Sequence, residues 1–276
     1  IKKEKKYLSK QRISIRETFT DSQKEIIADT TISYREKRKM IMESFSNDQK
    51  KLIDSYDKRI DSIMSNMTIE QKIGQMIMIR VNGDYYHSDS RYKNLLEDWI
   101  SKKHIGGVIT FSGSIHGTFY NIQQFQEWSK IPLFVAADYE RGLGQWMDSA
   151  TLFPSNMAVA ATGETNHAFE QGLVTSSEAK SIGVNIVLAP VLDINNNPAN
   201  PIINFRSYSD DPLIVSNFGN AFINGIQKNN IFSCIKHFPG HGNTSIDSHT
   251  SLPSIPGSRS ELLKNELFPF KKAVDN

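Results

Sequence analysis

Residues 231–249 read IFSCIKHFPGHGNTSIDSH, an apolar run that turns abruptly into a loop rich in glycine, serine and histidine. The run Ile231–Phe238 predicts a strand buried on both faces, as in a parallel sheet. Pro239, Gly240 and Gly242 then predict a loop. Because this loop carries histidine and aspartate at the end of a buried strand, it is a candidate functional site.

Four more apolar runs precede this one, and helical patterns lie between them and after the last. The expected strands are Met76–Val81, Ile105–Phe111, Pro132–Asp138, Val184–Ile194 and Ile231–Phe238. The expected helices are Arg91–Lys103, Thr118–Trp128, Thr165–Ser181, Pro212–Asn229 and Glu261–Val274. This alternation predicts an α/β fold with a parallel sheet and right-handed crossovers.

Polar residues end all five expected strands, which favours a barrel enzyme with its site at the carboxyl ends of the strands. These residues are Arg80, Asn82, Ser112, Asp138, Asp193, Lys236 and His237. At roughly 44 residues per strand–helix unit, eight units would need about 350 residues. The fold class is therefore predicted to be a TIM-like (β/α)8 barrel that is incomplete in this chain.

Residues 1–56 differ from the rest of the chain in composition. They predict a charged α-helical N-terminal extension, which precedes a barrel domain at residues 57–276. Residues 1–60 carry a net charge of +6 and contain no glycine or proline. A 26-residue internal repeat aligns FTDSQKEII at 19–27 with FSNDQKKLI at 45–53. Capping boxes are expected at Thr20–Gln23, Ser46–Gln49 and Thr68–Gln71. The extension could pack on a neighbouring domain, form a linker-like helical hairpin or present a basic face to an anionic surface.

Composition excludes several classes of protein. Lys and Arg number 32 against 30 Asp and Glu, and this net charge of +2 argues against a nucleic-acid-binding surface. A single cysteine, Cys234, excludes an internal disulfide framework and a cysteine-rich metal module. No apolar run is long enough for a transmembrane helix, and no signal peptide is visible.

Three interpretations of the loop after residue 238 remain open from its residues alone. His237, His241, His249 and Asp247 could bind a metal ion, although their spacing is irregular. The same groups could simply be solvated or cap turns. In the third interpretation Asp247 orients His249, two positions on, for proton exchange with a substrate.

Several motifs in order resemble glycoside hydrolase family 3 β-N-acetylhexosaminidases of the bacterial NagZ type, over about residues 57–276. The signature loop is KHFPGHGNTSIDSHTSLP at 236–253, and four upstream stretches agree with it in order and spacing. They are DSIMSNMTIEQKIGQMIMI (61–79), GGVITF (106–111), AADYERGLGQWMDSATLFPSNMAVAATG (136–163) and GVNIVLAPVLDINNNPANPIINFRSYSDDP (183–212).

This resemblance implies a role for each of six residues. Asp247 and His249 match the family's catalytic acid/base dyad, and the substrate-binding residues are implied to be Asp138, Arg206, Lys236 and His237. Two alternatives come from the residues themselves: Asp138 could instead be a helix N-cap, and Arg206 could instead pair with Asp210 or Asp211. Asp193 is interpreted as structural support.

The sequence departs from the family pattern at two points. The family's D-x-E-G-G-R-V-x-R is replaced by DYERGLGQW at 138–146, so the two usual arginines are absent and Arg141 is shifted. The nucleophilic aspartate of a later strand is also absent, and Asp210 and Asp211 do not replace it. We therefore expect the nucleophile beyond Asn276 and no turnover from the 276-residue chain alone.

The resemblance implies a retaining exo-β-N-acetylglucosaminidase that removes terminal β-N-acetylglucosamine from glycoconjugates such as peptidoglycan fragments. The expected partner is this carbohydrate substrate, and neither a metal nor an organic cofactor is implied. A neutral histidine does not repel an anionic acceptor, so phosphorolysis is compatible with the same dyad. The alternatives are a family 3 β-glucosidase or a non-catalytic sugar-binding fragment. The extension favours a bacterial protein exported to the periplasm or cell surface over a cytoplasmic one.

Overall fold

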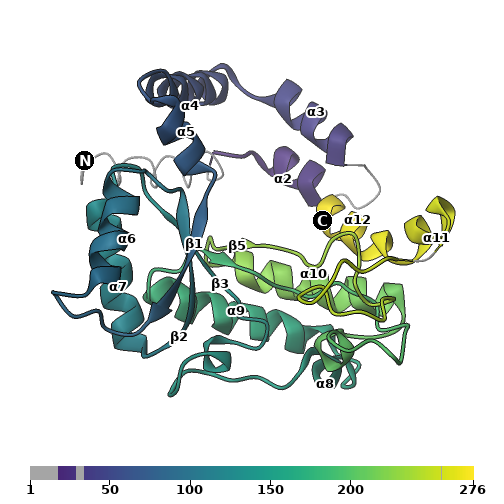
Figure 1. The fold of residues 1–276 in the computed structure, drawn as a ribbon. Helices are drawn as coiled ribbons and strands as arrows, with labels where there is room; N and C mark the ends of the chain where they lie inside the picture. Colours follow the sequence, from purple (N-terminus) through teal and green to yellow (C-terminus); the bar gives the residue numbers. More distant parts are fainter. Residues whose placement is uncertain (1–17, 29–33, 256) are drawn as a thin grey trace.

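The computed structural model describes residues 18–28, 34–255 and 257–276, and a five-stranded parallel sheet lies at its centre (Figure 1). The strands are β1 (Met78–Gly83), β2 (Gly107–Gly113), β3 (Phe134–Ala137), β4 (Ile186–Val187) and β5 (Phe232–Ser233). Their order in space is their order in the chain, so β1 and β5 are its edges. This is the strand arrangement of a TIM-like barrel that is not closed in this chain, as the sequence predicts.

The last two strands are shorter than the sequence predicts. The apolar run Val184–Ile194 contributes only two strand residues, since Pro190 has no N–H to donate to a ladder. Extended chain nevertheless continues past both strands: Leu192 donates to the carbonyl of Lys236, and Lys236 donates to the carbonyl of Pro190, at 2.6 and 3.1 Å. These bonds hold the segments after β4 and β5 side by side.

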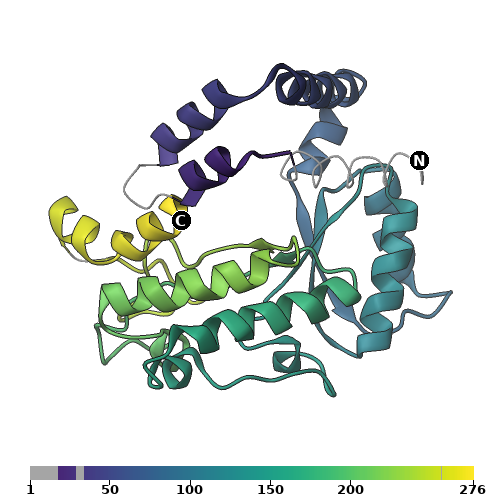
Figure 2. The same cartoon turned by 180° about the vertical axis from the view of Figure 1, so that it is seen from behind.

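All five expected helices are present: one has the predicted bounds, Thr165–Ser181, and each of the others differs at one end or more. Helices α6 (Arg91–Ser101) and α7 (Ile115–Trp128) lie beside β1 and β2, and α9 (Thr165–Ser181) and α10 (Pro212–Gln227) lie beside the later strands (Figures 1 and 2). The expected helix Glu261–Val274 is two helices, α11 (Arg259–Lys264) and α12 (Leu267–Asp275). The break places Pro269 in the first turn of α12, where its missing N–H has no helical partner to lose. A short helix α8 (Asn156–Ala160) was not expected.

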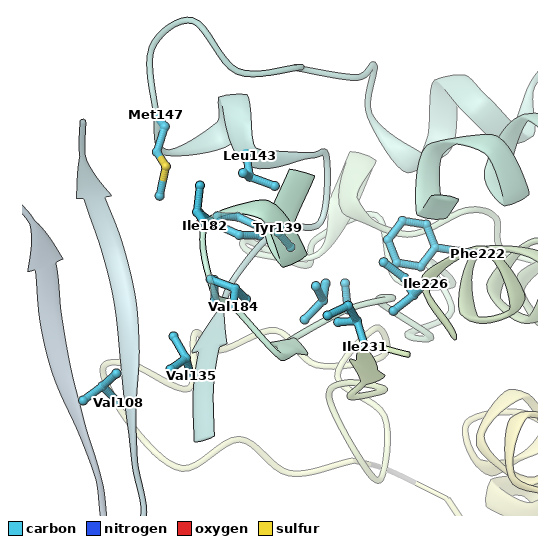
Figure 3. Close-up of a cluster of buried hydrophobic side chains, with 14 of the residues drawn as sticks. Val108, Val135, Tyr139, Leu143, Met147, Ile182, Val184, Phe222, Ile226 and Ile231 are labelled. Atoms are coloured by element: carbon cyan, nitrogen blue, oxygen red, sulfur yellow. The ribbon is translucent and has the colours of Figure 1, made fainter. Parts of the chain in front are cut away.

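The core lies between the sheet and the helices that cover it (Figure 3). Val108 of β2 and Val135 of β3 are paired in register, and both are fully buried. Phe222 and Ile226 of α10 are also fully buried in this cluster. Because each strand alternates its side chains, the positions between these apolar residues face the other side of the sheet.

The repeat in the N-terminal extension forms a symmetric contact. Helices α2 (Asp21–Ala28), α3 (Tyr34–Ser44) and α4 (Asn47–Ser65) lie in it, and α5 (Ile69–Gln75) leads into β1. All three expected capping boxes are present. The side-chain amides of Gln23 and Gln49, which are 26 residues apart, donate to each other at 3.2 and 3.0 Å, and the rings of Phe19 and Phe45 lie 5.9 Å apart. Helix α4 continues through the predicted boundary at 56/57, which stays a prediction.

Replacing Gln49 with alanine is expected to lower the free energy of unfolding by about 2 kcal/mol, because it removes one donor and one acceptor from the buried amide of Gln23. The amide of Gln49 also donates to the carbonyl of Thr18 at 2.8 Å. Chemical denaturation followed by circular dichroism measures the change. Lys50→Ala, at an exposed position of the same helix, is the control, and an equal loss in both variants would contradict the prediction.

Among the described residues, no helix combines the length and the apolar character needed to span a lipid bilayer.

Candidate functional site

The predicted substrate-binding residues and Asp193 gather where the parallel strands have their carboxyl ends. Asp138 follows β3, Asp193 lies in the segment after β4, and Lys236 and His237 follow β5. Arg206 comes from a single 3-10 turn, Asn204–Arg206, that precedes α10. Their contacts with one another bring these residues into one cluster.

A buried glutamate, Glu140, is at the centre of the cluster, and it was not among the predicted site residues. Its carboxylate accepts two hydrogen bonds from Arg206, at 3.0 Å from Nε and 2.6 Å from Nη2. Lys236 Nζ lies 2.6 Å from the same carboxylate and also forms an ion pair with Asp138. The Glu140 side chain is only 5% exposed, so these charges interact with little screening by solvent.

The protonation of Glu140 reflects this environment. Burial by itself raises the pKa of a carboxyl group, but the hydrogen bonds and positive charges of Arg206 and Lys236 outweigh it and lower the pKa of Glu140 to about 2. Glu140 therefore remains an anion at neutral pH. A signal for it was present in the sequence: Glu140 lies two positions after Asp138, and in extended chain the side chains of such residues point to the same side.

Both alternatives considered for Asp138 and Arg206 are wrong. Asp138 pairs with Lys236, and none of the helices that the structure describes begins at it. Arg206 pairs with Glu140, whereas Asp211 accepts from the N–H groups of Leu213 and Ile214 as the N-cap of α10. Asp138 Oδ2 makes no hydrogen bond with any residue that the structure describes, so it remains open to a ligand.

Asp193 supports two histidines from a fully buried position, as predicted. Its carboxylate lies 2.5 Å from Nδ1 of His237 and accepts from the backbone N–H of His241 at 2.6 Å. Because Asp193 is the acceptor, His237 carries a proton on Nδ1, and its Nε2 can accept from Arg206 Nη2 at 3.2 Å. The orientation of His237 is therefore determined at both ring nitrogens.

Asp247 and His249 are in contact, as their spacing predicts. Nδ1 of His249 lies 2.7 Å from Oδ1 of Asp247, which also accepts from the backbone N–H of His249 at 2.8 Å. These two hydrogen bonds lower the pKa of Asp247, and the one from the backbone N–H contributes more than the one from the ring. With Nδ1 held by the carboxylate, Nε2 is the nitrogen that can exchange a proton, and the His249 side chain is 76% exposed.

The geometry disfavours the metal interpretation of the loop. The three histidine rings face different partners: His237 faces Asp193, His241 faces Thr244 and Ser248, and His249 faces Asp247. In residues 18–28, 34–255 and 257–276, no three His, Cys, Asp or Glu side chains converge in a way that could hold a metal ion.

The departure at 138–146 replaces an arginine with a tryptophan that packs beside the cluster. Trp146 Nε1 donates to the carbonyl of Asp138 at 2.8 Å. Its ring meets the ring of Phe111 edge to face, with centroids 5.5 Å apart, and the Arg80 guanidinium lies 4.4 Å from the centre of Phe111. Trp146 and Phe111 therefore form an aromatic pair next to Asp138 of the cluster.

A family model and similar curated proteins point to the same protein family. The model of the glycosyl hydrolase family 3 N-terminal domain matches residues 68–276. Beta-hexosaminidase A of Pseudoalteromonas piscicida is 32% identical over 231 residues, which cover 75% of this chain and 39% of that protein. A beta-N-acetylglucosaminidase/beta-glucosidase of Cellulomonas fimi is 32% identical over 190 residues, covering 69% of this chain and 32% of that protein.

Solved structures agree with the sequence comparison. A glycoside hydrolase family 3 beta-N-acetylglucosaminidase from Paenibacillus has a TM-score of 0.69 at 34% identity, over 75% of this chain and 40% of the other. The beta-glucoside phosphorylase BglX also has a TM-score of 0.69, at 28% identity, over 78% of this chain and 38% of the other. The chain thus spans less than half the length of these four proteins.

Proposed function

The chain belongs to glycosyl hydrolase family 3, and from this we propose that the whole protein is a retaining exo-β-N-acetylglucosaminidase. The names of the Pseudoalteromonas and Paenibacillus proteins support the choice of an N-acetylated sugar. The observation that carries the proposal is the Asp247–His249 contact, since it provides an oriented imidazole on an exposed loop beside a cluster of charged side chains.

In this proposal the buried cluster binds the hydroxyl groups of the terminal sugar. Asp138 offers a carboxylate oxygen with no partner among the described residues, and Lys236, Arg206 and His237 are each partly exposed. Charge-assisted hydrogen bonds from such groups suit the crowded hydroxyls of a pyranose, because they are strong and directional. Glu140 keeps the two cations in place and contributes little surface of its own.

Proton transfer is assigned to His249. In the first step its Nε2 protonates the leaving oxygen while a carboxylate attacks the anomeric carbon, which gives a covalent glycosyl-enzyme. In the second step the neutral imidazole takes a proton from water, which hydrolyses that intermediate. Asp247 holds Nδ1 throughout, so Nε2 remains directed at the substrate.

The attacking carboxylate is proposed to come from sequence beyond Asn276. Asp210 and Asp211 do not fit this role, because Asp211 caps α10 and Asp210 lies beside it on the surface. We also propose an exported bacterial protein that acts on peptidoglycan fragments, without a cofactor. A family 3 β-glucosidase or β-glucoside phosphorylase is the second candidate, and the similarity to BglX and to the Cellulomonas protein favours it.

The test is the ratio of kcat/KM for an aryl β-N-acetylglucosaminide to that for the matching aryl β-glucoside, measured on the longer gene product. We expect the acetamido sugar to be preferred at least about tenfold, because a site that binds a substrate polar group discriminates against its absence. Adding inorganic phosphate and identifying the product separates hydrolysis from phosphorolysis. A preference for the glucoside, or no activity on either substrate, would contradict the proposal.

A further inference from the structure

The loop that carries Asp247 and His249 has a fixed stem and an exposed tip. In the stem, residues 240–244, the side-chain amide of Asn200 donates to the carbonyls of His241 at 2.7 Å and of Thr244 at 2.9 Å. At Gly242 a Cβ atom would lie 1.7 Å from the carbonyl oxygen of Ile194, so the stem is packed directly against the backbone after β4. In the tip, residues 245–255, most side chains are exposed.

The dyad is held together within the tip, but this does not place it relative to the sugar-binding cluster. Asp247 bonds to His249 two residues away, and its carbonyl accepts from the N–H of Thr250 at 3.0 Å. These contacts would survive if the whole tip moved. Contacts between the tip and the rest of the chain therefore decide where the dyad lies. Asn197 donates to Oγ of Ser245 at 3.1 Å where the tip begins, so a contact next to the dyad itself is the one to look for.

His241 supplies such a contact from a buried position. The residue is only 7% exposed, and its Nε2 lies 3.1 Å from Oγ of Ser248, the residue between Asp247 and His249. Its backbone N–H donates to Asp193, the carboxylate that also holds His237. One buried aspartate thus connects the sugar-binding cluster to the acid/base loop through His241.

The hydrogen bonds of His241 determine its tautomer. Thr244 Oγ1 donates its one hydrogen to the carbonyl of His241 at 2.9 Å. The same oxygen lies 2.5 Å from Nδ1 of His241, and in that contact it must therefore be the acceptor. The proton of a neutral ring is therefore on Nδ1, and Nε2 accepts from the Ser248 hydroxyl. Thr244 and Ser248 thus hold the ring between them in one orientation.

We propose that His241 is a positioning residue: by holding Ser248 it places the Asp247–His249 dyad at the glycosidic oxygen. This rests on the proposed function, since it assigns a partner to the acid/base loop of that same site. Loss of the His241–Ser248 contact leaves the dyad intact but lets the tip move away from the cluster. Proton transfer to a poor leaving group is then impaired, whereas binding of the terminal sugar is not.

Two substitutions separate positioning from general stability. His241→Gln keeps a polar atom near the place of Nε2 and can still reach Ser248. His241→Asn keeps one only near Nδ1, where it can reach Thr244 but not Ser248. Both fill much of the same buried space, so a purely structural role predicts similar behaviour for the two variants.

The first measurement needs no activity. Proteinase K digestion of the 276-residue chain, with the cleavage sites mapped by mass spectrometry, reports how often the tip opens. We expect the His241→Asn chain to be cleaved between residues 245 and 255 about fivefold faster than the wild type, because the loss of one side-chain hydrogen bond changes an equilibrium by about that factor. The His241→Gln chain should be cleaved at about the wild-type rate. His167→Asn, on α9, is the control. Equal rates in all variants would overturn the proposal.

The second measurement uses the longer gene product. With a poor leaving group we expect His241→Asn to lower kcat/KM about 10- to 100-fold with little change in KM, and with an activated aryl leaving group we expect a much smaller loss. His241→Gln should keep most of the wild-type kcat/KM with the poor leaving group. Equal losses on both substrates overturn the positioning role. If the wild type hydrolyses neither substrate, the proposed function fails, and the cleavage rates of the loop alone decide whether His241 anchors it.

Discussion

Replacing His249 with alanine in the longer gene product is expected to lower kcat/KM for a substrate with a poor leaving group by about 10²- to 10⁴-fold, the usual contribution of a positioned general acid. Such a leaving oxygen must be protonated as the bond breaks, and Nε2 of His249 is the atom assigned to do so. An activated aryl glycoside needs no such proton, so its first step should change far less. Steady-state kinetics on the two substrates measures the difference.

His167→Ala is a suitable control for the loss of a histidine, because His167 lies on α9 and its one ion-pair partner in the described part of the chain is Glu164. Activity of the His249 variant should not return with higher substrate concentration, since sugar binding is assigned to other residues. An equal loss on the poor and the activated leaving group would contradict the acid/base role.

Replacing Glu140 with alanine is expected to lower the free energy of unfolding of the chain by about 3–5 kcal/mol, the range for removing one partner of a buried ion pair. Among the described residues, Arg206 would then lose its ion pair and Lys236 would keep only Asp138 as a charged partner, in a region with little access to solvent. Urea denaturation at pH 7 measures the loss. Asp98→Asn, which breaks an exposed pair with Lys102, should cause no measurable change.

The contribution of Glu140 to the free energy of unfolding should decrease as the pH is lowered. The pKa of Glu140 is lowered from 4.5 to about 2 in the folded chain, so its contribution is fully present above pH 4.5 and is lost as pH falls toward 2. The difference between the wild type and the variant should therefore shrink over this window. A difference that stays constant down to pH 2 would show that the loss comes from packing and not from charge.

The local features of the chain could be predicted from the sequence because they depend on groups a few residues apart. All three capping boxes form, and α9 has the predicted bounds. The Asp247–His249 contact spans two residues and is present. The predicted strand lengths were less accurate for β4 and β5, which have only two residues each. Pro190 cannot donate a hydrogen bond to a neighbouring strand, and the chain turns toward the site after both strands.

The sequence by itself determined the parallel α/β order, the three capping boxes and the loop in which aspartate can hold histidine, since burial patterns and short-range hydrogen bonds encode these. Only the tertiary structure decided that Arg206 and Lys236 converge on Glu140, that Asp193 holds both His237 and the stem of the loop, and that Gln23 pairs with Gln49. These partners lie from 26 to 96 positions apart in the sequence. A buried charge or amide takes the partner that the fold brings within reach, because leaving it unpaired in a low-dielectric interior costs more than any local preference supplies.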